Sequence, residues 1–175
     1  MVAVIMDFSK FCAGTLLTTT HILTAAHCIN SYNFFELYMG SMDYTDINLR
    51  ISYTTTSKSV HPNFSPNTLN NDVGLLFVSD IYSEYFAGQI SVVRLPPLTQ
   101  ENFDFTGSQA TATGWGKGDS GGPLHVIESD GNYTQIAVVS FQSSYSCLTY
   151  PNGFARIMAF KSYLATNANY VFRSS

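Results

Sequence analysis

The chain has 175 residues, of which 45% are hydrophobic and only 11% charged, so it can bury a sizeable core as one domain or two small ones. Its net charge of −4 supplies no basic surface for nucleic acid, and no apolar run reaches the roughly 18 residues of a membrane span. With so few charges, the polar surface must come from Ser, Thr, Asn and Tyr, which suits an all-β protein with many exposed strand faces. We therefore expect neither nucleic-acid nor membrane partners.

Six short apolar or alternating runs predict six β-strands in the first half of the chain. A threonine-rich turn at 18–20 joins the second and third of them, and Pro62 and Pro66 place a loop after the fifth. The predicted strands are Val2–Met6, Phe11–Leu17, Ile22–Ala25, Phe35–Met39, Asn48–Val60 and Val73–Val78.

The second half begins after a long connection, residues 79–107, which the pair Pro96-Pro97 stiffens. Within it, Val92, Val93 and Leu95 are expected to pack against the first half. Apolar residues at helical spacing predict a terminal helix over Ile157–Ala165. Four further strands are predicted, Gln109–Trp115, Leu124–Ile127, Gln135–Phe141 and Phe154–Ile157.

Three motifs carry the residue types of a nucleophilic site. Ser120 stands in the stretch GDSGGP, where glycines on both sides allow a tight turn and keep side chains away from a substrate. His27 ends the apolar run LTAAHC, and Asp72 stands at the start of the strand in NDVGLL. Each motif alone has a plainer interpretation, as a surface turn, a buried histidine or a strand-end cap. Together they place His, Asp and Ser in the order of a known catalytic triad.

With these three motifs the chain resembles the chymotrypsin-type (trypsin-like) serine proteases over nearly all of its length. The resemblance implies an all-β fold of two antiparallel six-stranded barrels, the second incomplete, with a short C-terminal helix. The first barrel would occupy residues 1–80, the connection 81–108, and the remnant of the second barrel with the helix 109–175. The stretch GWG at residues 114–116 matches the opening strand of that second barrel.

The resemblance assigns a role to each site residue. Ser120 would be the nucleophile, His27 the general base and then acid, and Asp72 the group that orients the imidazole. The backbone N–H groups of Gly118 and Ser120 would form the oxyanion hole. Substrate would contact three consecutive residues, Ser140, Phe141 and Gln142.

The cysteines and histidines bear on disulfides and metal sites. Three cysteines leave one thiol over, and the resemblance implies a disulfide between Cys12 and Cys28 with Cys147 free; two buried thiols are the alternative. The spacing of His21, His27 and Cys28 matches no zinc pattern, so neither a metal nor a cofactor is expected.

The sequence also departs from the family. Roughly fifty residues are missing between the GWG strand and the Ser120 turn, which the order of the triad alone would not reveal. In the family, a new N-terminal amine pairs with the carboxylate that Asp119 represents, whereas this chain starts at Met1 inside the first strand. We therefore expect Asp119 to become protonated or to turn to water, with impaired activity.

Three functions follow from these features. The first is a serine-type endopeptidase, impaired in this shortened form, with polypeptide substrates or protease inhibitors as partners. The second is a non-catalytic protease homologue that binds a partner, and the third is a non-functional product of splicing or gene prediction. An extracellular location follows from the resemblance, and the acceptor triplets at Asn63 and Asn132 agree with it. The run Val2–Met6 is too short for the apolar core of a secretory signal, so no signal peptide is expected.

Overall fold

The structure is a computed structural model that describes residues 1–79, 81, 90–116, 119–141 and 152–175. Three residues with predicted roles, Gly118, Gln142 and Cys147, lie outside these ranges. None of the helices in the described part of the chain has the length and apolar character needed to cross a membrane.

The first half forms one antiparallel seven-stranded sheet, in the order β5-β4-β1-β2-β3-β7-β6. The prediction of six strands is corrected to seven, because residues 48–60 form two strands and not one. Only the second of these pairs with β7, so the chain passes from one edge of the sheet to the other at residues 56–57. The strands are β1 (Val2–Met6), β2 (Lys10–Thr18), β3 (His21–Thr24), β4 (Phe35–Met39), β5 (Ile51–Thr55), β6 (Lys58–Val60) and β7 (Gly74–Phe77).

The second half forms a smaller antiparallel sheet of four described strands, in the order β11-β10-β9-β8. β10 lies at its centre and is buried over seven consecutive residues, as a strand covered on both faces must be. The strand predicted over Gln109–Trp115 shrinks to two residues. The strands are β8 (Thr111–Ala112), β9 (Pro123–Ile127), β10 (Tyr133–Phe141) and β11 (Gly153–Arg156).

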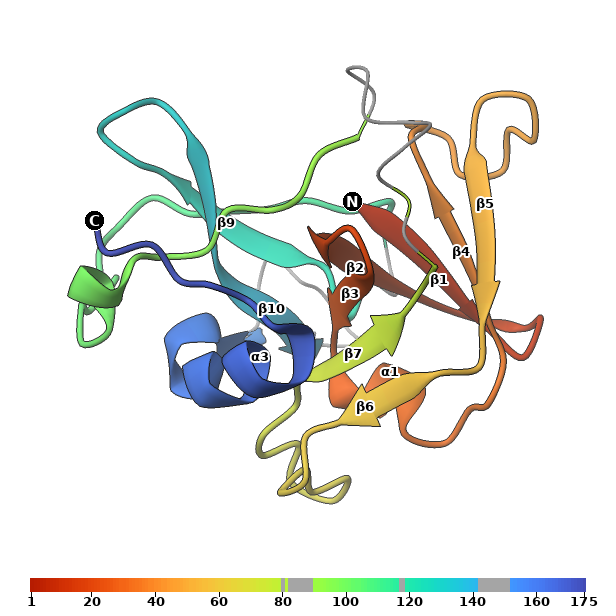
Figure 1. The fold of residues 1–175 in the computed structure, drawn as a ribbon, viewed down its shortest axis with the longest axis horizontal. Coiled ribbons are helices and arrows are strands. Elements are labelled where there is room, and N and C mark those ends of the chain that lie inside the picture. The colour runs from red at the N-terminus through yellow and green to blue at the C-terminus, as the bar shows by residue number, and fades with distance from the viewer. Residues whose placement is uncertain (80, 82–89, 117–118, 142–151) are drawn as a thin grey trace.

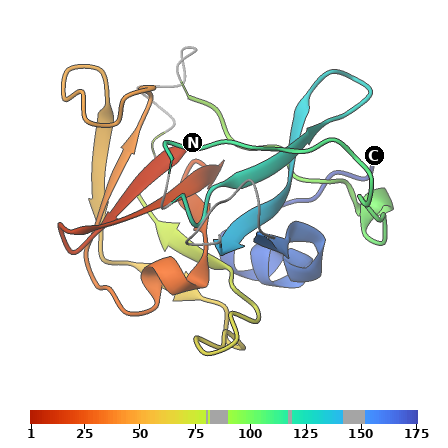
Figure 2. The same cartoon turned by 180° about the vertical axis from the view of Figure 1, so that it is seen from behind.

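Two sheets and a terminal helix confirm the predicted all-β class. Figure 1 shows β1–β7 curled together on one side and β9, β10 and α3 on the other, with the C-terminus beside the second sheet. Seen from behind in Figure 2, the described residues 90–116 run between the two halves of the molecule. Short helices complete the fold, namely α1 (Ala26–Ile29), the 3₁₀ turns η1 (Leu98–Gln100) and η2 (Ile157–Phe160), and α3 (Lys161–Ala168).

A single apolar core joins the two halves. Leu164 of α3 and Val138 of β10 are fully buried in the same cluster as Leu23 and Leu75 of the first sheet. In the connection, Leu95 is fully buried and Val93 donates its N–H to the carbonyl of Leu16, as expected, whereas Val92 is exposed. The core thus continues across the predicted boundaries at residues 80 and 108, which themselves remain a prediction.

A buried polar bridge also links the sheets. The hydroxyl of Thr15 in β2 donates to Oε1 of Gln135 in β10 at 2.8 Å, and Gln135 Nε2 donates to the carbonyl of Ala137. Both side chains lie where water is excluded. Because a buried polar group without a partner costs about 1–3 kcal/mol, this pairing favours one relative position of the two sheets.

Candidate active site

His27 is held by a disulfide and a single helical turn. Cys12 of β2 is bonded to Cys28 of α1, so the predicted pairing is present in the structure. The disulfide closes a loop of 16 residues, which in the chain-entropy model stabilises the fold by about 3 kcal/mol. It ties α1 to β2 and leaves the His27 side chain 29% exposed, so the imidazole remains accessible to a substrate.

Asp72 reaches His27 from the segment just before β7. Asn71 has a φ of 56°, a left-handed conformation that asparagine tolerates better than most residues. Asp72 Oδ2 accepts from His27 Nδ1 at 2.8 Å, and Oδ1 accepts the backbone N–H of His27, also at 2.8 Å. The carboxylate therefore caps the first turn of α1, whose own N-cap residue provides no side-chain hydrogen bond. One side chain thus fixes both the backbone and the ring of His27.

Ser140 supplies a third hydrogen bond to this carboxylate. Its hydroxyl donates to Asp72 Oδ2 at 2.5 Å. The β10–β11 pairing shifts register between Val139 and Phe141, and such an irregularity redirects the side chain at its centre. Ser140 thus contacts Asp72 and also lines the cavity beside it, and its contact with substrate stays a prediction.

The surroundings of Asp72 select one tautomer of the neutral His27 ring. The Asp72 side chain is fully buried, and a buried carboxylate is tolerated when several donors surround it. Two of its three donors come from His27. Because Asp72 Oδ2 can only accept, Nδ1 carries the proton in the neutral imidazole. Nε2 is then left as an acceptor, which is the state that a general base requires.

The turn that carries Ser120 is anchored to both sheets. The Ser120 carbonyl accepts from Ala13 of β2 at 2.8 Å, and the N–H of Gly121 donates to Val139 of β10 at 2.7 Å. Gly121 has a φ of +87°, and a Cβ there would lie 2.2 Å from the carbonyl oxygen of Ala13. Only glycine fits this position, as the motif predicted.

Ser120 and His27 lie on either side of the disulfide. Sγ of Cys28 is 3.6 Å from His27 Nε2 and 3.5 Å from the carbonyl oxygen of Ser120. One sulfur atom thus contacts both the free nitrogen of the base and the backbone of the serine. Among the described interactions, however, no hydrogen bond joins Ser120 Oγ to His27 Nε2. Such bonds are often long in a free enzyme and tighten when substrate binds.

Asp119 departs from expectation. Without a partner amine it is expected either to become protonated or to turn to water, but its side chain is buried, with a residue exposure of 6%. Its carboxylate accepts the backbone N–H of Trp115 at 3.0 Å and that of Gly116 at 2.5 Å. Of the two alternatives, the turn to water is therefore wrong, because the chain supplies two donors that side-chain patterns do not reveal; protonation stays a prediction.

A cavity of about 320 Å³ opens beside Asp72. It lies between the loop 68–72 and the facing strands β10 and β11, and its walls include Leu69, Phe141 and Phe154. The Phe141 ring packs so closely on Gly153 that a Cβ there would lie 1.9 Å from a ring carbon. Of the predicted substrate segment, Phe141 faces this cavity and Gln142 lies outside the described residues.

Cys12, His27 and Cys28 gather their sulfur and nitrogen atoms within 4.8 Å of one another. The two sulfur atoms are bonded to each other in the disulfide and so provide no thiolate. The cluster is accounted for by its structural role.

Comparison with known proteins adds independent observations. The family model described as Trypsin matches residues 1–117. A venom serine protease of Polistes dominula is 32% identical over 115 residues, covering 61% of this chain and 40% of its own length. A chymotrypsin of Phaedon cochleariae is 24% identical over 219 residues, covering 97% of this chain and 76% of its own length. The chain thus spans less than half of one relative and about three quarters of the other.

The fold and the missing segment are both visible in these comparisons. The solved structure of HL collagenase is 24% identical, with a TM-score of 0.84 over 98% of this chain and 94% of the collagenase, which shows a common fold. The Phaedon alignment of 219 positions exceeds this 175-residue chain by 44, so at least 44 positions lack a counterpart here. The family match ends at residue 117, where the internal segment was predicted to be missing.

Proposed function

Because the chain belongs to the trypsin family of chymotrypsin-type serine endopeptidases, we propose that it attacks peptide bonds with Ser120, using His27 as base and Asp72 as the orienting carboxylate. The observation that carries the proposal is the Asp72 carboxylate, which holds both the ring and the backbone of His27 at 2.8 Å. A carboxylate that served only as a helix cap would not need the second contact, to Nδ1.

The proposed reaction follows from this arrangement. Nε2 of His27 takes the hydroxyl proton of Ser120 as Oγ bonds to the substrate carbonyl carbon, and the imidazolium is stabilised by buried Asp72. The same proton passes to the leaving amine when the C–N bond breaks, which leaves an acyl group on Ser120. Water then attacks the acyl carbon, with His27 again as base, and releases the acid. The backbone N–H of Ser120, together with that of Gly118, is the proposed donor pair for the oxyanion.

Polypeptides are the proposed substrates, and protease inhibitors the proposed competing ligands. The cavity beside Asp72 supports this, since its apolar wall of Leu69, Phe141 and Phe154 suits a substrate side chain next to the scissile bond. We propose an extracellular site of action, supported by the disulfide and by the venom protease among the relatives.

We further propose that turnover is impaired. The segment missing between the GWG stretch and the Ser120 turn supplies, in the family, the base of the pocket that orients the substrate. A substrate misplaced by only about 1 Å relative to the catalytic groups can react about 10²-fold more slowly. We therefore expect peptide hydrolysis at least about a hundredfold slower than in a complete family member, while Ser120 still reacts with a small activated probe.

Labelling with a fluorophosphonate probe tests the assignment. The purified chain should be labelled slowly on Ser120, Ser120→Ala should abolish labelling, and His27→Ala should strongly reduce it. Ser9→Ala and His125→Ala are matched controls, because both residues lie outside the site, and they should label as the unchanged chain does. A fully folded chain that takes no label would instead support the non-catalytic binding homologue, and label that survives Ser120→Ala would remove this serine from the mechanism.

A further inference from the structure

Lys58 of β6 binds the end of the helical turn that carries His27. Its ammonium donates to the backbone carbonyl of Ile29 at 2.8 Å and to that of Asn30 at 3.2 Å, and it also donates to the carbonyl of Tyr32. An ammonium group has three N–H donors, so these contacts use its full capacity. The catalytic assignment gives Lys58 no role, although Lys58 binds the segment that directly follows the proposed base.

The Lys58 ammonium has no carboxylate partner. None of the ion pairs in the described part of the chain involves it, and it lies over the ring of Phe35, with Nζ 5.9 Å from the ring centroid. Burial lowers the pKa of Lys58, with a smaller opposing effect from Asp7. Lysine usually keeps its ammonium in water, so the backbone carbonyls must here replace much of that hydration.

The turn that Lys58 binds is too short to be stable by itself. A single helical turn fixes several backbone angles for very few hydrogen bonds, and α1 closes on one bond of 2.8 Å from the N–H of Asn30 to the carbonyl of Ala26. The carbonyls at the end of a helix have no partner within it. Cationic side chains stabilise such carbonyls, and Lys58 supplies the cation here.

Both ends of the turn are held from one pair of strands. Asp72, just before β7, accepts the N–H of His27 at the start of α1, and Lys58 of β6 binds the carbonyls at its end. β6 pairs with β7, and Figure 1 shows α1 beside both strands. Gly74 of β7 lets α1 lie close, because a Cβ there would be 2.6 Å from Cδ1 of Ile29. The imidazole is thus carried by a turn that is fixed at its two ends.

We propose that Lys58 is a positioning residue for the base, because by holding the end of α1 it sets the approach of His27 Nε2 to Ser120. It touches no reacting atom and acts only through α1. The kinetic consequence rests on the proposed function, whereas the hold on α1 does not. Because a misplacement of about 1 Å can lower a rate about 10²-fold, loss of this hold should slow the reaction of Ser120 in a protein that is still folded.

Lys58→Met tests the role of the ammonium, because methionine keeps an unbranched stem and removes the charge. The rate constant for fluorophosphonate labelling of Ser120 should fall at least about tenfold. In peptide hydrolysis kcat should fall while KM stays within about twofold, since Lys58 lies outside the cavity beside Asp72. Lys10→Met, the same change at an exposed lysine, should alter neither. Should Lys58→Met fail to fold, Lys58→Gln carries the test, because its neutral amide keeps two N–H donors on a shorter stem.

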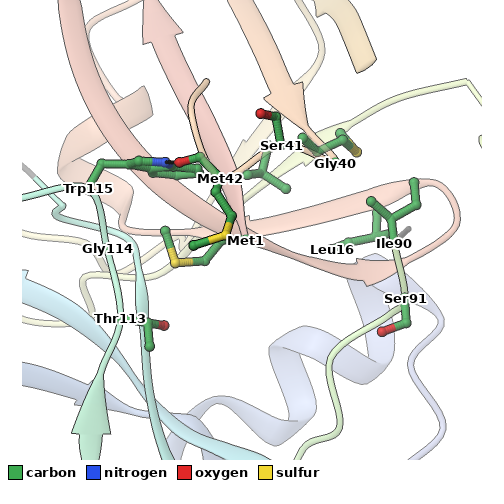
Figure 3. Close-up of a pocket in the computed structure, with 12 residues that line it drawn as sticks. Met1, Leu16, Gly40, Ser41, Met42, Ile90, Ser91, Thr113, Gly114 and Trp115 are labelled. Carbon is green, nitrogen blue, oxygen red and sulfur yellow. Dashed lines mark hydrogen bonds between the residues drawn. The ribbon is translucent and has the colours of Figure 1, made fainter. Parts of the chain in front are cut away.

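A second control separates positioning from a general loss of stability. Figure 3 shows Ile90 at the wall of a cavity of about 460 Å³, and of the described residues that line this cavity none belongs to α1 or β6. Ile90→Ala removes apolar contacts from the common core, so it should lower the denaturation midpoint, as Lys58→Met should. Labelling of Ser120 in Ile90→Ala should nevertheless stay within about twofold of the unchanged chain. If folded Lys58→Met labels at the unchanged rate, or if both variants slow equally, Lys58 acts on stability alone and the proposal is overturned.

Chemical restoration of the ammonium gives a further test. In Lys58→Cys the new thiolate can displace bromide from 2-bromoethylamine, which forms a C–S bond and a side chain of lysine length that ends in an ammonium. Labelling of Ser120 should be slow before this alkylation and return to within about threefold of the unchanged chain after it. The unchanged chain, alkylated in the same way, controls for Cys147, and the disulfide between Cys12 and Cys28 is kept by omitting reductant. No recovery in a folded chain whose modification is confirmed by mass would overturn the proposal.

Amide hydrogen exchange measures the hold on α1 without any catalysis. The N–H groups of His27 and Asn30 are hydrogen-bonded at the two ends of the turn. They should exchange at least about tenfold faster in Lys58→Met than in Ile90→Ala, because only the first change frees the turn locally. If the unchanged, folded chain takes no label, the proposed function fails, and this exchange alone then decides the role of Lys58. Faster exchange in Lys58→Met supports the hold on α1, and equal exchange in the two variants refutes it.

Discussion

Replacing Asp72 by asparagine should remove the base without unfolding the site. Of the two carboxylate oxygens, Oδ1 accepts a backbone N–H of His27, which cannot be reversed. Oδ2 accepts from the ring Nδ1 and from the Ser140 hydroxyl, and both of these groups can change from donor to acceptor. The new NH₂ group should therefore take the Oδ2 position, because every partner there can adapt.

The consequence is a change of tautomer in His27. Nδ1 must then accept, the proton moves to Nε2, and Nε2 can no longer take the proton of Ser120. The expected fall in kcat is roughly 10⁴-fold, or about 5.4 kcal/mol at 1.36 kcal/mol for each factor of ten. Stability should change by less than about 1 kcal/mol, since all hydrogen-bonding groups regain partners.

Single-turnover acylation by an activated ester, together with denaturant titration, measures both quantities for Asp72→Asn. Asp104→Asn is the matched control, because Asp104 also accepts two hydrogen bonds, both from Thr106, on the exposed surface. Its acylation rate should be unchanged. If folded Asp72→Asn is acylated at a rate within tenfold of the unchanged chain, the argument from tautomers is refuted. If the variant unfolds, the contact between residue 72 and the backbone N–H of His27 matters more for stability than the argument allows.

Three further changes test the packing around the site. Gln135→Leu leaves the buried hydroxyl of Thr15 without its acceptor, so denaturant titration should show about 1–3 kcal/mol of lost stability; a loss within error would mean that the bridge does not couple the sheets. Gly121→Ala should cost about 3 kcal/mol or more, because it combines a φ of +87° with contacts of 2.2 Å, and a smaller cost would show that the turn can relax. Burial beside the rings of Phe160 and Tyr163 lowers the pKa of His61 in the folded protein. Below a pH of about 6.5 the unfolded chain therefore binds more protons at His61 than the folded protein does. The free energy of unfolding should accordingly fall as the pH drops through that value. His61→Phe should flatten this dependence by no more than about 1.4 kcal/mol per pH unit, and an unchanged slope would assign it to other groups.

Much of the fold could be predicted from local pattern. Apolar runs located most strands within one or two residues, but nothing between Thr55 and Lys58 marks the break between β5 and β6. The predicted helix Ile157–Ala165 begins earlier than α3, because its apolar spacing starts in the 3₁₀ turn η2. Asn169, with a φ of 50°, is a typical helix-ending residue and could have located the end of α3.

The site could be predicted less completely than the fold. The three motifs identified His27, Asp72 and Ser120, because residue types and their order carry the chemistry. The hydrogen bond from Ser140 to Asp72 depends on a shift of strand register, which no residue type announces. The partners of Asp119 are backbone N–H groups, which every residue except proline possesses, so sequence alone could not select them.

Trapping an acyl-enzyme tests the central claim most directly. The purified 175-residue chain would be mixed with an activated ester, quenched in acid, and its tryptic or peptic fragments weighed by mass spectrometry. The account predicts one acyl group per chain, located on Ser120 and formed far more slowly in His27→Ala. Acylation spread over other residues, or an acyl group on Ser120 that forms equally fast without His27, would contradict it.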